Sequence, residues 1–175
     1  MENNKPNNNR GATPGRGSRP QGGRGGRPDR ARTERAKPEF DQKMLEVRRV
    51  ARVVAGGRRF SFAVAIVAGN RNGKVGVGTG KAGDTASAID KAMKSAKKSM
   101  ITIPMGENRS IKHQTFAKYA SARVMLKPAQ GRGLVAGSAV RSVLELAGIT
   151  DVNAKVLSPS KNKLNIARAT IQALS

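Results

Sequence analysis

Apolar residues alternate with small or polar ones between residues 60 and 68, a period of two that predicts a β-strand. One side of this strand is apolar throughout and is expected to face a core: Phe60, Phe62, Val64, Ile66 and Ala68. Asn72-Gly73 is a preferred pair for a tight hairpin turn, and a second strand should follow it over residues 74–80. Glycines alternate with valines there, and glycine in a strand often marks a place where another surface comes close.

The apolar positions of residues 39–55 fit both a strand and a helix. The β-branched pair Val53-Val54 at the end of this segment, followed by Gly56-Gly57, favours a strand that leads into a hairpin. Three strands are therefore expected before residue 82.

A helix is expected from Asp84, whose carboxylate is a good N-cap, to about Met100. Its buried stripe should consist of Ile89, Met93, Ala96 and Met100. The opposite side carries lysines that fit a solvated face and an RNA contact equally well, namely Lys91, Lys94 and Lys98.

The second half of the chain alternates between the two periods. Residues 101–118 are weakly patterned and receive no assignment. The pattern then predicts a strand over residues 122–127, a helix capped by Ser138 and stopped by Gly148, a strand over 152–156 and a helix that opens at Asn165. This order predicts an α/β sandwich with helices on one face of the sheet.

Composition divides the chain into residues 1–38, 39–102 and 103–175. The first part is rich in Gly, Pro and Arg and contains no aromatic residue, Val, Ile or Leu. It lacks the apolar surface needed to offset its ordering entropy, so we expect it to be disordered when free. Its dense positive charge favours RNA contact over a solvated tail without a partner.

A formal net charge of +23 over 175 residues favours a polyanionic partner, above all nucleic acid. No apolar run approaches the roughly 20 residues that span a bilayer, and the N-terminus has no apolar segment of the secretory type. The chain has no cysteine, which excludes disulfides and thiolate chemistry. We therefore expect a nucleic-acid partner, no membrane and no small-molecule substrate.

Motifs for catalysis are weak. Residues 78–83 match the dinucleotide fingerprint G-x-G-x-x-G, but a lone match carries little, and a phosphate loop would need Ser or Thr in place of Ala82. His113 is the single histidine and has no evident triad or metal partner. We expect no enzyme, no cofactor and no metal, with a nucleotide-dependent enzyme built on residues 78–83 as the weaker alternative.

Two glycine-containing basic segments are candidates for contact with a polyanion. In Gly56-Gly57-Arg58-Arg59, a turn without Cβ atoms lets the backbone approach another surface, and the arginines offer charge to a phosphate. Gly131-Arg132-Gly133 precedes a helix N-terminus, which suits an RNA phosphate or a partner's carboxylate. Phe60 and Phe62 fit a core stripe better than a base-stacking platform, which favours duplex or folded RNA over single strands.

Several longer motifs run through the chain in a fixed order. The first half contains Val54-Ala55-Gly56-Gly57-Arg58-Arg59-Phe60-Ser61-Phe62, Gly76-Val77-Gly78-x-Gly80-Lys81 and Ala88-Ile89-x-Lys91-Ala92. The second half contains Lys127-Pro128-Ala129, Gly131-x-Gly133, Ala136-Gly137, Val140-Arg141-x-Val143-Leu144-Glu145, Ala147-Gly148-Ile149 and Asn165-Ile166-x-Arg168-Ala169-Thr170. In order and spacing, residues 39–175 resemble the bacterial small-subunit ribosomal protein S-five family.

The resemblance implies an α+β fold. Its N-terminal domain should be similar to the double-stranded-RNA-binding fold, with three strands and a helix, and its C-terminal domain should be an α/β sandwich of the S-five type. The resemblance also implies a cytoplasmic ribosomal protein without a cofactor, bound to small-subunit ribosomal RNA. Proteins S-four and S-eight and the point where messenger RNA enters should lie nearby, and the family supports subunit assembly and influences decoding accuracy.

Charge, turn chemistry and the resemblance together select the candidate ribosomal-RNA-binding residues Arg49, Arg52, Gly56, Gly57, Arg58, Arg59, Lys74 and Lys81. The resemblance implies a loop near the spectinomycin site that contains Arg49, Val50, Ala51, Arg52, Gly56 and Gly57. It places Arg132, Gly133 and Arg141 on the S-four side, although Arg132 stands where the family usually has Thr. A free RNA chaperone or nucleoid-type protein, suggested mainly by residues 1–38, is the alternative function.

Overall fold

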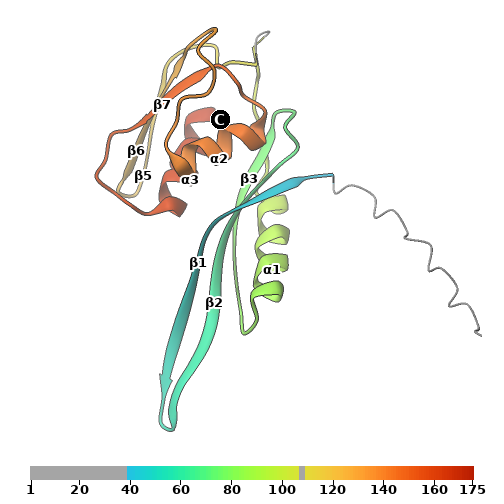
Figure 1. Cartoon of the computed structure of the whole chain (residues 1–175), viewed down its shortest axis with the longest axis vertical. Coiled ribbons are helices and arrows are strands. Elements are labelled where there is room, and N and C mark those ends of the chain that lie inside the picture. Colours follow the sequence, from blue (N-terminus) through green and yellow to red (C-terminus); the bar gives the residue numbers. More distant parts are fainter. Residues whose placement is uncertain (1–38, 107–108) are drawn as a thin grey trace, which may run out of the picture. The chain divides into compact units, whose positions relative to one another are not determined.

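The computed structural model describes residues 39–106 and 109–175, which belong to one compact unit (Figure 1). The predicted disordered arm, residues 1–38, lies outside the described residues. The first sheet is antiparallel, with the strand order β1-β2-β3-β4. Its elements, with the helix that follows β3, are β1 (Asp41–Val54), β2 (Gly57–Gly69), β3 (Lys74–Ala82), α1 (Thr85–Lys98) and β4 (Ile101–Thr102).

The ambiguous segment before Gly56 is a strand, so the prediction of a strand leading into a hairpin is confirmed. Its pairing with β2 shifts by one residue between Met44 and Glu46, which leaves Leu45 as the extra residue of a β-bulge. Leu45 is buried in the core, while Met44 is about half exposed. The bulge explains why neither a strict period of two nor a helical stripe described this segment.

The β2–β3 connection is longer than the tight turn predicted at Asn72-Gly73. Four residues, 70–73, separate the strands. The side-chain oxygen of Asn70 accepts hydrogen bonds from the amides of Asn72 (2.8 Å) and Lys74 (3.0 Å), so this side chain shapes the loop.

The glycines of β3 lie directly against α1. A Cβ atom on Gly78 would lie 2.1 Å from the carbonyl oxygen of Ala92. A Cβ atom added to Gly76 would lie 2.4 Å from the carbonyl oxygen of Ala96. One added to Gly80 would lie 2.2 Å from the carbonyl oxygen of Ala88. The surface that comes close to this strand is therefore the chain's own helix α1.

This close approach also turns α1 away from its predicted orientation. The fully buried residues are Ala88, Ala92 and Ala96, spaced four apart. Of the predicted stripe, Ala96 is correct, whereas the larger Ile89 and Met93 are only half-buried beside it. Small side chains on the helix and glycines on the strand let the two backbones meet, so volume and not hydrophobicity selects the buried face. The Asp84 cap is confirmed, because its carboxylate accepts from the Ala86 amide at 3.2 Å.

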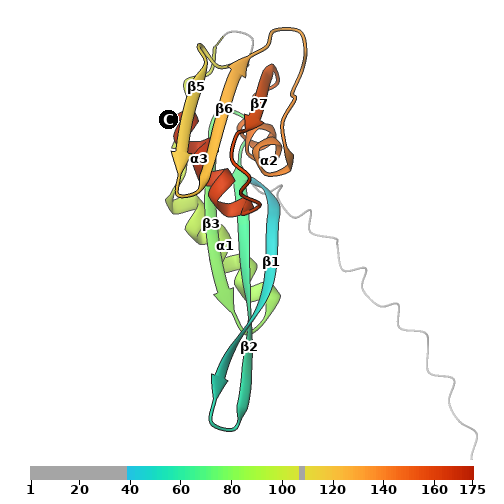
Figure 2. The same ribbon diagram turned by 90° about the vertical axis from the view of Figure 1, so that its left-hand side faces the viewer.

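The second sheet is antiparallel, with the order β5-β6-β7, and α2 and α3 lie on one side of it (Figures 1 and 2). Its strands β6 and β7, and the Gly148 stop of α2 at φ +85°, confirm the sequence pattern. Strand β5 falls in the segment left unassigned. The elements are β5 (Thr115–Tyr119), β6 (Ala122–Pro128), α2 (Ser138–Ala147), β7 (Val152–Val156) and α3 (Lys163–Leu174).

Two predicted helix starts are wrong by one to three residues. Helix α3 is capped by Asn162 and not opened by Asn165, because the Asn162 side chain accepts from the amides of Leu164 and Asn165. Helix α2 has Gly137 at the N-cap, and Ser138 makes no cap hydrogen bond. The predicted residues, Ser138 and Asn165, both have side chains suited to capping. The path of the backbone decides which of several neighbouring residues is the N-cap.

One hydrophobic cluster joins the two sheets. It contains Val67 and Val75 from the first sheet together with Leu144 and Leu146 of α2 and Leu126 of β6. The architecture confirms the predicted α+β class, with a two-residue strand β4 in addition to the three expected strands. The predicted domain border between residues 102 and 103 falls after β4 and stays a prediction. Among the described residues, no helix has the length and apolar character of a membrane span.

Candidate nucleic-acid interface

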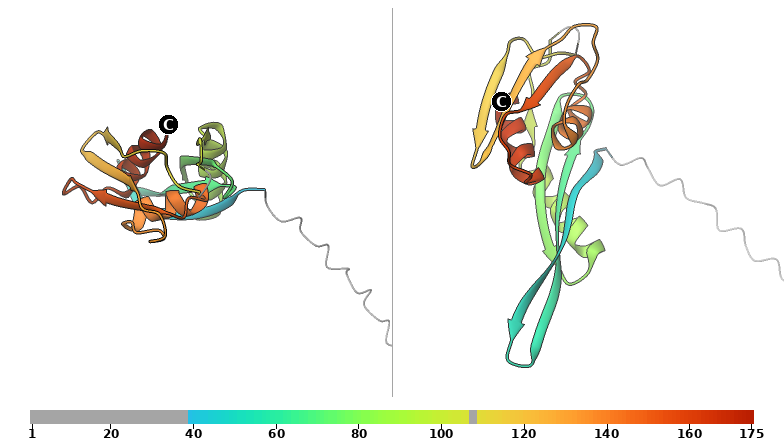
Figure 3. Two further views of the ribbon diagram at one scale, coloured as in Figure 1. Left: turned by 90° about the horizontal axis from the view of Figure 1, so that it is seen from above. Right: turned by 60° about the vertical axis from the view of Figure 1, so that its left-hand side comes forward.

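The outer part of the β1–β2 hairpin is a two-stranded ribbon without further cover. Strand β3 pairs with β2 only as far as Phe62, so residues 50–61 continue beyond it, as Figure 3 shows. We call this segment the ribbon. An isolated two-stranded hairpin is marginally stable in water, and the ribbon is anchored by the sheet from which it continues. Its backbone and side chains are correspondingly open to a partner.

The arginines of the ribbon lie close together without a counter-ion in the ribbon itself. Arg52 is paired directly across the strands with Arg59, and directly paired side chains have Cβ atoms about 5 Å apart. Like charges at such a pair repel each other, and both side chains are exposed. Residues 50–61 contain no Asp or Glu. A phosphate between the two guanidinium groups would relieve this repulsion and accept hydrogen bonds from both.

Phe60 is not the core residue that the alternating pattern predicted. It is 50% exposed, and the Arg49 guanidinium lies over its ring, 4.6 Å from the ring centre. Burial along β2 does not alternate: residues 64–69 are all buried because both faces of the strand are covered there, and residues 57–60 are all exposed because β3 does not reach the ribbon. Phe62 is half-buried, at the edge of the core. The ring of Phe60 and the stacked Arg49 form a flat surface on the face of the hairpin opposite to the paired arginines.

The two glycines of the tip differ in their structural requirement. Gly57 has φ +137°, a conformation that other residues rarely adopt, so the backbone itself requires glycine there. Gly56 has no such angle, and an added Cβ would meet nothing within 4 Å. Nothing inside the described protein therefore explains the glycine at position 56.

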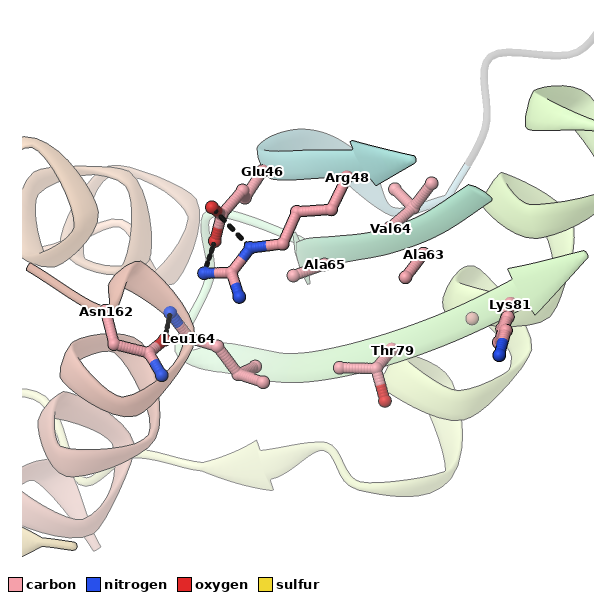
Figure 4. A pocket seen from close by; sticks show the side chains of 10 residues that line it. Glu46, Arg48, Ala63, Val64, Ala65, Thr79, Lys81, Asn162 and Leu164 are labelled. Atoms are coloured by element: carbon pink, nitrogen blue, oxygen red, sulfur yellow. Dashed lines mark hydrogen bonds and ion pairs between the residues drawn. The ribbon is translucent and has the colours of Figure 1, made fainter. Parts of the chain in front are cut away.

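A second group of cations lies on one face of the first sheet, nearer the core. Arg48, Ala63 and Lys81 form one row across β1, β2 and β3, and Figure 4 shows Arg48 and Lys81 on either side of the small Ala63. They line a cavity of about 420 Å³ that also reaches Asn162 and Leu164 at the start of α3.

Glu46 is the acid of this cavity, and it neutralises Arg48. The Arg48 guanidinium donates to both Glu46 carboxylate oxygens, at 2.6 and 2.8 Å, and these bonds lower the pKa of Glu46 below its ordinary value. The sequence prediction omitted Arg48. Its position one residue before Arg49 carried no distinguishing signal, because only the strand pairing shows that it shares a face with Lys81.

Lys74 is not part of this group. It begins β3, whereas Lys81 lies seven residues later, so the two are about 23 Å apart along the strand. Lys74 is exposed beside the 70–73 loop and pairs with Thr102 of β4. The structure thus places Arg52 and Arg59 on one face of the hairpin and Arg49 and Arg58 on the other, with Lys81 near its base, and it separates Lys74 from them.

The second predicted segment, Gly131-Arg132-Gly133, already contains an anion from the chain itself. The Gly133 amide donates to the Asp151 carboxylate at 3.2 Å, and the Arg141 side chain donates to the Leu134 carbonyl at 3.3 Å. Helix α2 starts only at Ser138, so its N-terminus does not adjoin the glycine loop. Arg132 is exposed. Asp151, which sequence analysis did not single out for this loop, therefore supplies an anionic partner from within the chain, and contact of Arg132, Gly133 and Arg141 with another molecule stays a prediction.

The weak catalytic motifs gain nothing from the fold. In the dinucleotide-like motif, Gly78 and Gly80 are needed for contact with α1, which explains them without a nucleotide. His113 is exposed in the segment before β5. Among the described residues, no three His, Cys, Asp or Glu side chains gather as a metal site would require.

Comparison with known proteins gives matches over both halves. Residues 40–104 match the family model described as ribosomal protein S5, N-terminal domain, and residues 117–175 match that of its C-terminal domain. Curated relatives named small ribosomal subunit protein uS5 include that of Mesomycoplasma hyopneumoniae strain 7448, 42% identical over 145 residues. That of Gloeobacter violaceus is 47% identical over 148 residues, and that of Thermosynechococcus vestitus is 46% identical over 138 residues. These alignments cover 82%, 84% and 78% of this chain and 67%, 66% and 79% of the respective relatives. The chain therefore belongs to the ribosomal protein S5 family.

Proposed function

We propose that this protein is a structural component of the small ribosomal subunit and that it binds ribosomal RNA through the ribbon. Family membership supports the first part, since the relatives are named small ribosomal subunit proteins. It also agrees with the expectation that the chain is not an enzyme. The protein would then reside on the ribosome in the cytoplasm.

One observation carries the RNA-binding proposal. Arg52 and Arg59 face each other on an exposed ribbon that contains no acidic residue. This arrangement costs the isolated protein free energy, whereas a polyanion stabilises it. Phosphate contacts of this kind fix the position of a protein on RNA without reading sequence. The ribbon would bind one RNA segment. The rigid sheet and helices behind it would fix the position of that segment relative to other RNA segments bound by the protein.

The finer parts of the proposal follow the family resemblance. Residues 49–52, Gly56 and Gly57 of the β1–β2 hairpin would lie near the RNA helix of the spectinomycin site. The exposed Arg132, with Gly133 and Arg141, would lie on the side of ribosomal protein S-four, and S-eight would be a further neighbour. In these positions the protein would support subunit assembly and influence decoding accuracy close to the path of messenger RNA.

A pair of double variants tests the ribbon. Arg58→Ala/Arg59→Ala removes two charges from the ribbon, and Lys112→Ala/Lys161→Ala removes two exposed charges from the second half of the chain. Binding to a small-subunit ribosomal RNA transcript is measured over a range of salt concentrations. The ribbon variant should lower the slope of log K against log salt by about 1–2, because each lost phosphate contact removes about 0.9. An equal effect of both variants would mean that net charge alone matters and would count against the ribbon.

The alternative of a free RNA chaperone or nucleoid-type protein has a separate test. Small subunits are pelleted under gentle salt and the protein is quantified in pellet and supernatant. One copy per small subunit in the pellet supports the ribosomal function. Recovery of the protein mainly in the supernatant would favour the alternative.

A further inference from the structure

The outer face of the second sheet is a separate surface that the proposed function does not use. Helices α2 and α3 cover one side of β5-β6-β7, and no described helix or strand covers the other, which faces the viewer in Figure 2. Side chains alternate across a sheet, so every second residue of the three strands lies on this open side. We call it the outer face and define it as Phe116, Lys118, Arg123, Met125, Lys127, Asn153 and Lys155.

Charge on the outer face is of one sign. Its basic residues are all exposed, and none of them is paired with an acid in the described structure: Lys118, Arg123, Lys127 and Lys155. The three strands contain no Asp or Glu. Asp151 comes directly before β7, but its carboxylate accepts from the Gly133 amide. Such a surface complements a polyanion and repels a basic partner.

An aromatic side chain lies within this basic surface. Phe116 is 62% exposed, pairs across the strands with Met125, and Met125 pairs with Lys155 on the next strand. Lys118 and Arg123 are directly paired in the adjacent row, again two like charges with no counter-ion. A single exposed phenylalanine is ordinary. A phenylalanine in a row with a thioether and cations, on an open sheet, is the arrangement in which sheet proteins stack unpaired bases.

We propose that the outer face binds single-stranded RNA, with one base stacked on Phe116 and the backbone phosphates on Lys118, Arg123, Lys127 and Lys155. The basic residues span about 13 Å along β6, from Arg123 to Lys127, and about 10 Å across three strands. That area accommodates two or three nucleotides, the number that an open sheet usually holds. The bases of a duplex are stacked on one another, so a duplex would contact the basic side chains through its phosphates and no base would stack on Phe116.

The decisive variant is one that does not change the net charge of the protein. The chain's high positive charge attracts any nucleic acid, so loss of a lysine would weaken binding wherever the RNA lay. Phe116→Ala leaves the charge unchanged and removes only the stacking surface. The matched control is Met44→Ala, which truncates another half-exposed apolar side chain, on β1 of the first sheet. Thermal unfolding of both variants establishes that they are folded, and exposed substitutions of this kind rarely alter stability.

Binding is measured with the full-length protein and a fluorescent oligouridylate of about ten nucleotides, which has no duplex structure. Phe116→Ala should weaken this binding at least fivefold, and Met44→Ala should change it less than twofold. Ultraviolet cross-linking of the same RNA should label the peptide that contains Phe116. The ribbon variant Arg58→Ala/Arg59→Ala is measured in parallel, so that failure here and failure of the ribbon proposal are separate results.

Three results would overturn the proposal. Phe116→Ala could bind the oligonucleotide as tightly as the unaltered protein. Cross-links could appear only within the ribbon. An acidic peptide could displace the RNA fully at equal charge concentration, and this would assign the face to an acidic protein segment and not to RNA.

Discussion

The main-chain amide of Gly73 donates a 2.9 Å hydrogen bond to the carbonyl oxygen of Ala147. Together with the bond from the Arg71 amide to the Leu146 carbonyl, also 2.9 Å, it attaches the β2–β3 loop to the last turn of α2. The final carbonyls of a helix have no partner within the helix itself. The loop of one half of the protein thus supplies what the helix of the other half lacks, so the two halves are joined by backbone as well as by side chains.

Gly148 should be essential for this joint. It has φ +85°, and an added Cβ would lie 2.1 Å from the carbonyl oxygen of Arg71. We expect Gly148→Ala to lower the free energy of unfolding by at least about 2 kcal/mol, since it combines backbone strain with a clash against main-chain atoms. Chemical denaturation measures this. Gly83→Ala is the control, because Gly83 has no positive φ and an added Cβ meets nothing within 4 Å; equal stability of the two variants would contradict the assignment.

Gly78 should be equally intolerant for a different reason. Its added Cβ would lie 2.1 Å from the Ala92 oxygen and 2.3 Å from the Ala96 nitrogen, both main-chain atoms of α1. Gly78→Ala must push the helix off the sheet, and we expect a loss of about 3 kcal/mol or more in unfolding free energy. Thr79→Ala, at the next position and exposed on the other face, should cost less than about 1 kcal/mol. A stable Gly78→Ala protein would show that helix and strand are not in contact as described.

Gly56 should matter for RNA and not for folding. Gly56→Ala is expected to leave the unfolding free energy within about 0.5 kcal/mol of the unaltered protein. It should weaken binding to ribosomal RNA several-fold while keeping the salt slope, because a methyl group at the tip hinders close approach without changing charge. Denaturation and RNA titration of the same preparation test both parts. Unchanged RNA affinity would remove Gly56 from the interface.

Glu46 should restrain RNA binding by neutralising Arg48. Glu46→Gln frees Arg48 next to Lys81, so RNA affinity should rise and the salt slope should steepen by up to about 0.9. Glu145→Gln is the control of equal charge, since Glu145 pairs at 2.8 Å with Lys43, away from the ribbon. If both variants gain the same affinity, the increase reflects net charge and not the release of Arg48.

The pH dependence of the Glu46–Arg48 pair follows from the same contact. The pKa of Glu46 is lower in the folded protein than in the unfolded chain, because Arg48 donates to its carboxylate. The pair therefore contributes stability above the unfolded pKa, and this contribution disappears as the pH falls through the lowered folded pKa. Both side chains are partly exposed, so the effect is small. Glu46→Gln should accordingly flatten the acid side of the stability curve slightly, and an unchanged curve would show that the pair is not formed in solution.

Much of the fold was predictable because local sequence and tertiary packing agree. The β2 strand, the Asp84 cap and the Gly148 stop were predicted from local signals, and the structure confirms all three, although residues 64–69 are buried on both faces of the strand. Strand β5 was missed because its Phe116 lies on the open side and its inner positions include Thr115 and the small Ala117, so no clear apolar period remains. When the largest apolar residue of a strand lies on the exposed face of the sheet, the alternation of apolar and polar residues no longer indicates which face is buried.

The candidate interface was predictable in composition and not in arrangement. The hairpin tip could be predicted as a basic turn because the short motif Gly56-Gly57-Arg58-Arg59 itself contains both the turn glycines and the charges. The facing of Arg52 and Arg59 and the stacking of Arg49 on Phe60 depend on strand register. Asp151 reaches Gly133 from a position 18 residues later in the chain. Contacts of this kind leave no local trace because they join residues that only the folded chain brings together.

The sequence by itself determined the polyanionic partner, the hairpin and most strands and helices, because charge, period and turn residues act over a few neighbouring positions. Tertiary structure alone decided which surface each glycine serves. Helix α1 packs directly against Gly76, Gly78 and Gly80, and the β2–β3 loop packs against Gly148. Nothing in the described protein lies within 4 Å of a Cβ added to Gly56. A glycine in the sequence indicates either a special backbone angle or a close neighbour, and which of the two applies depends on how distant segments pack.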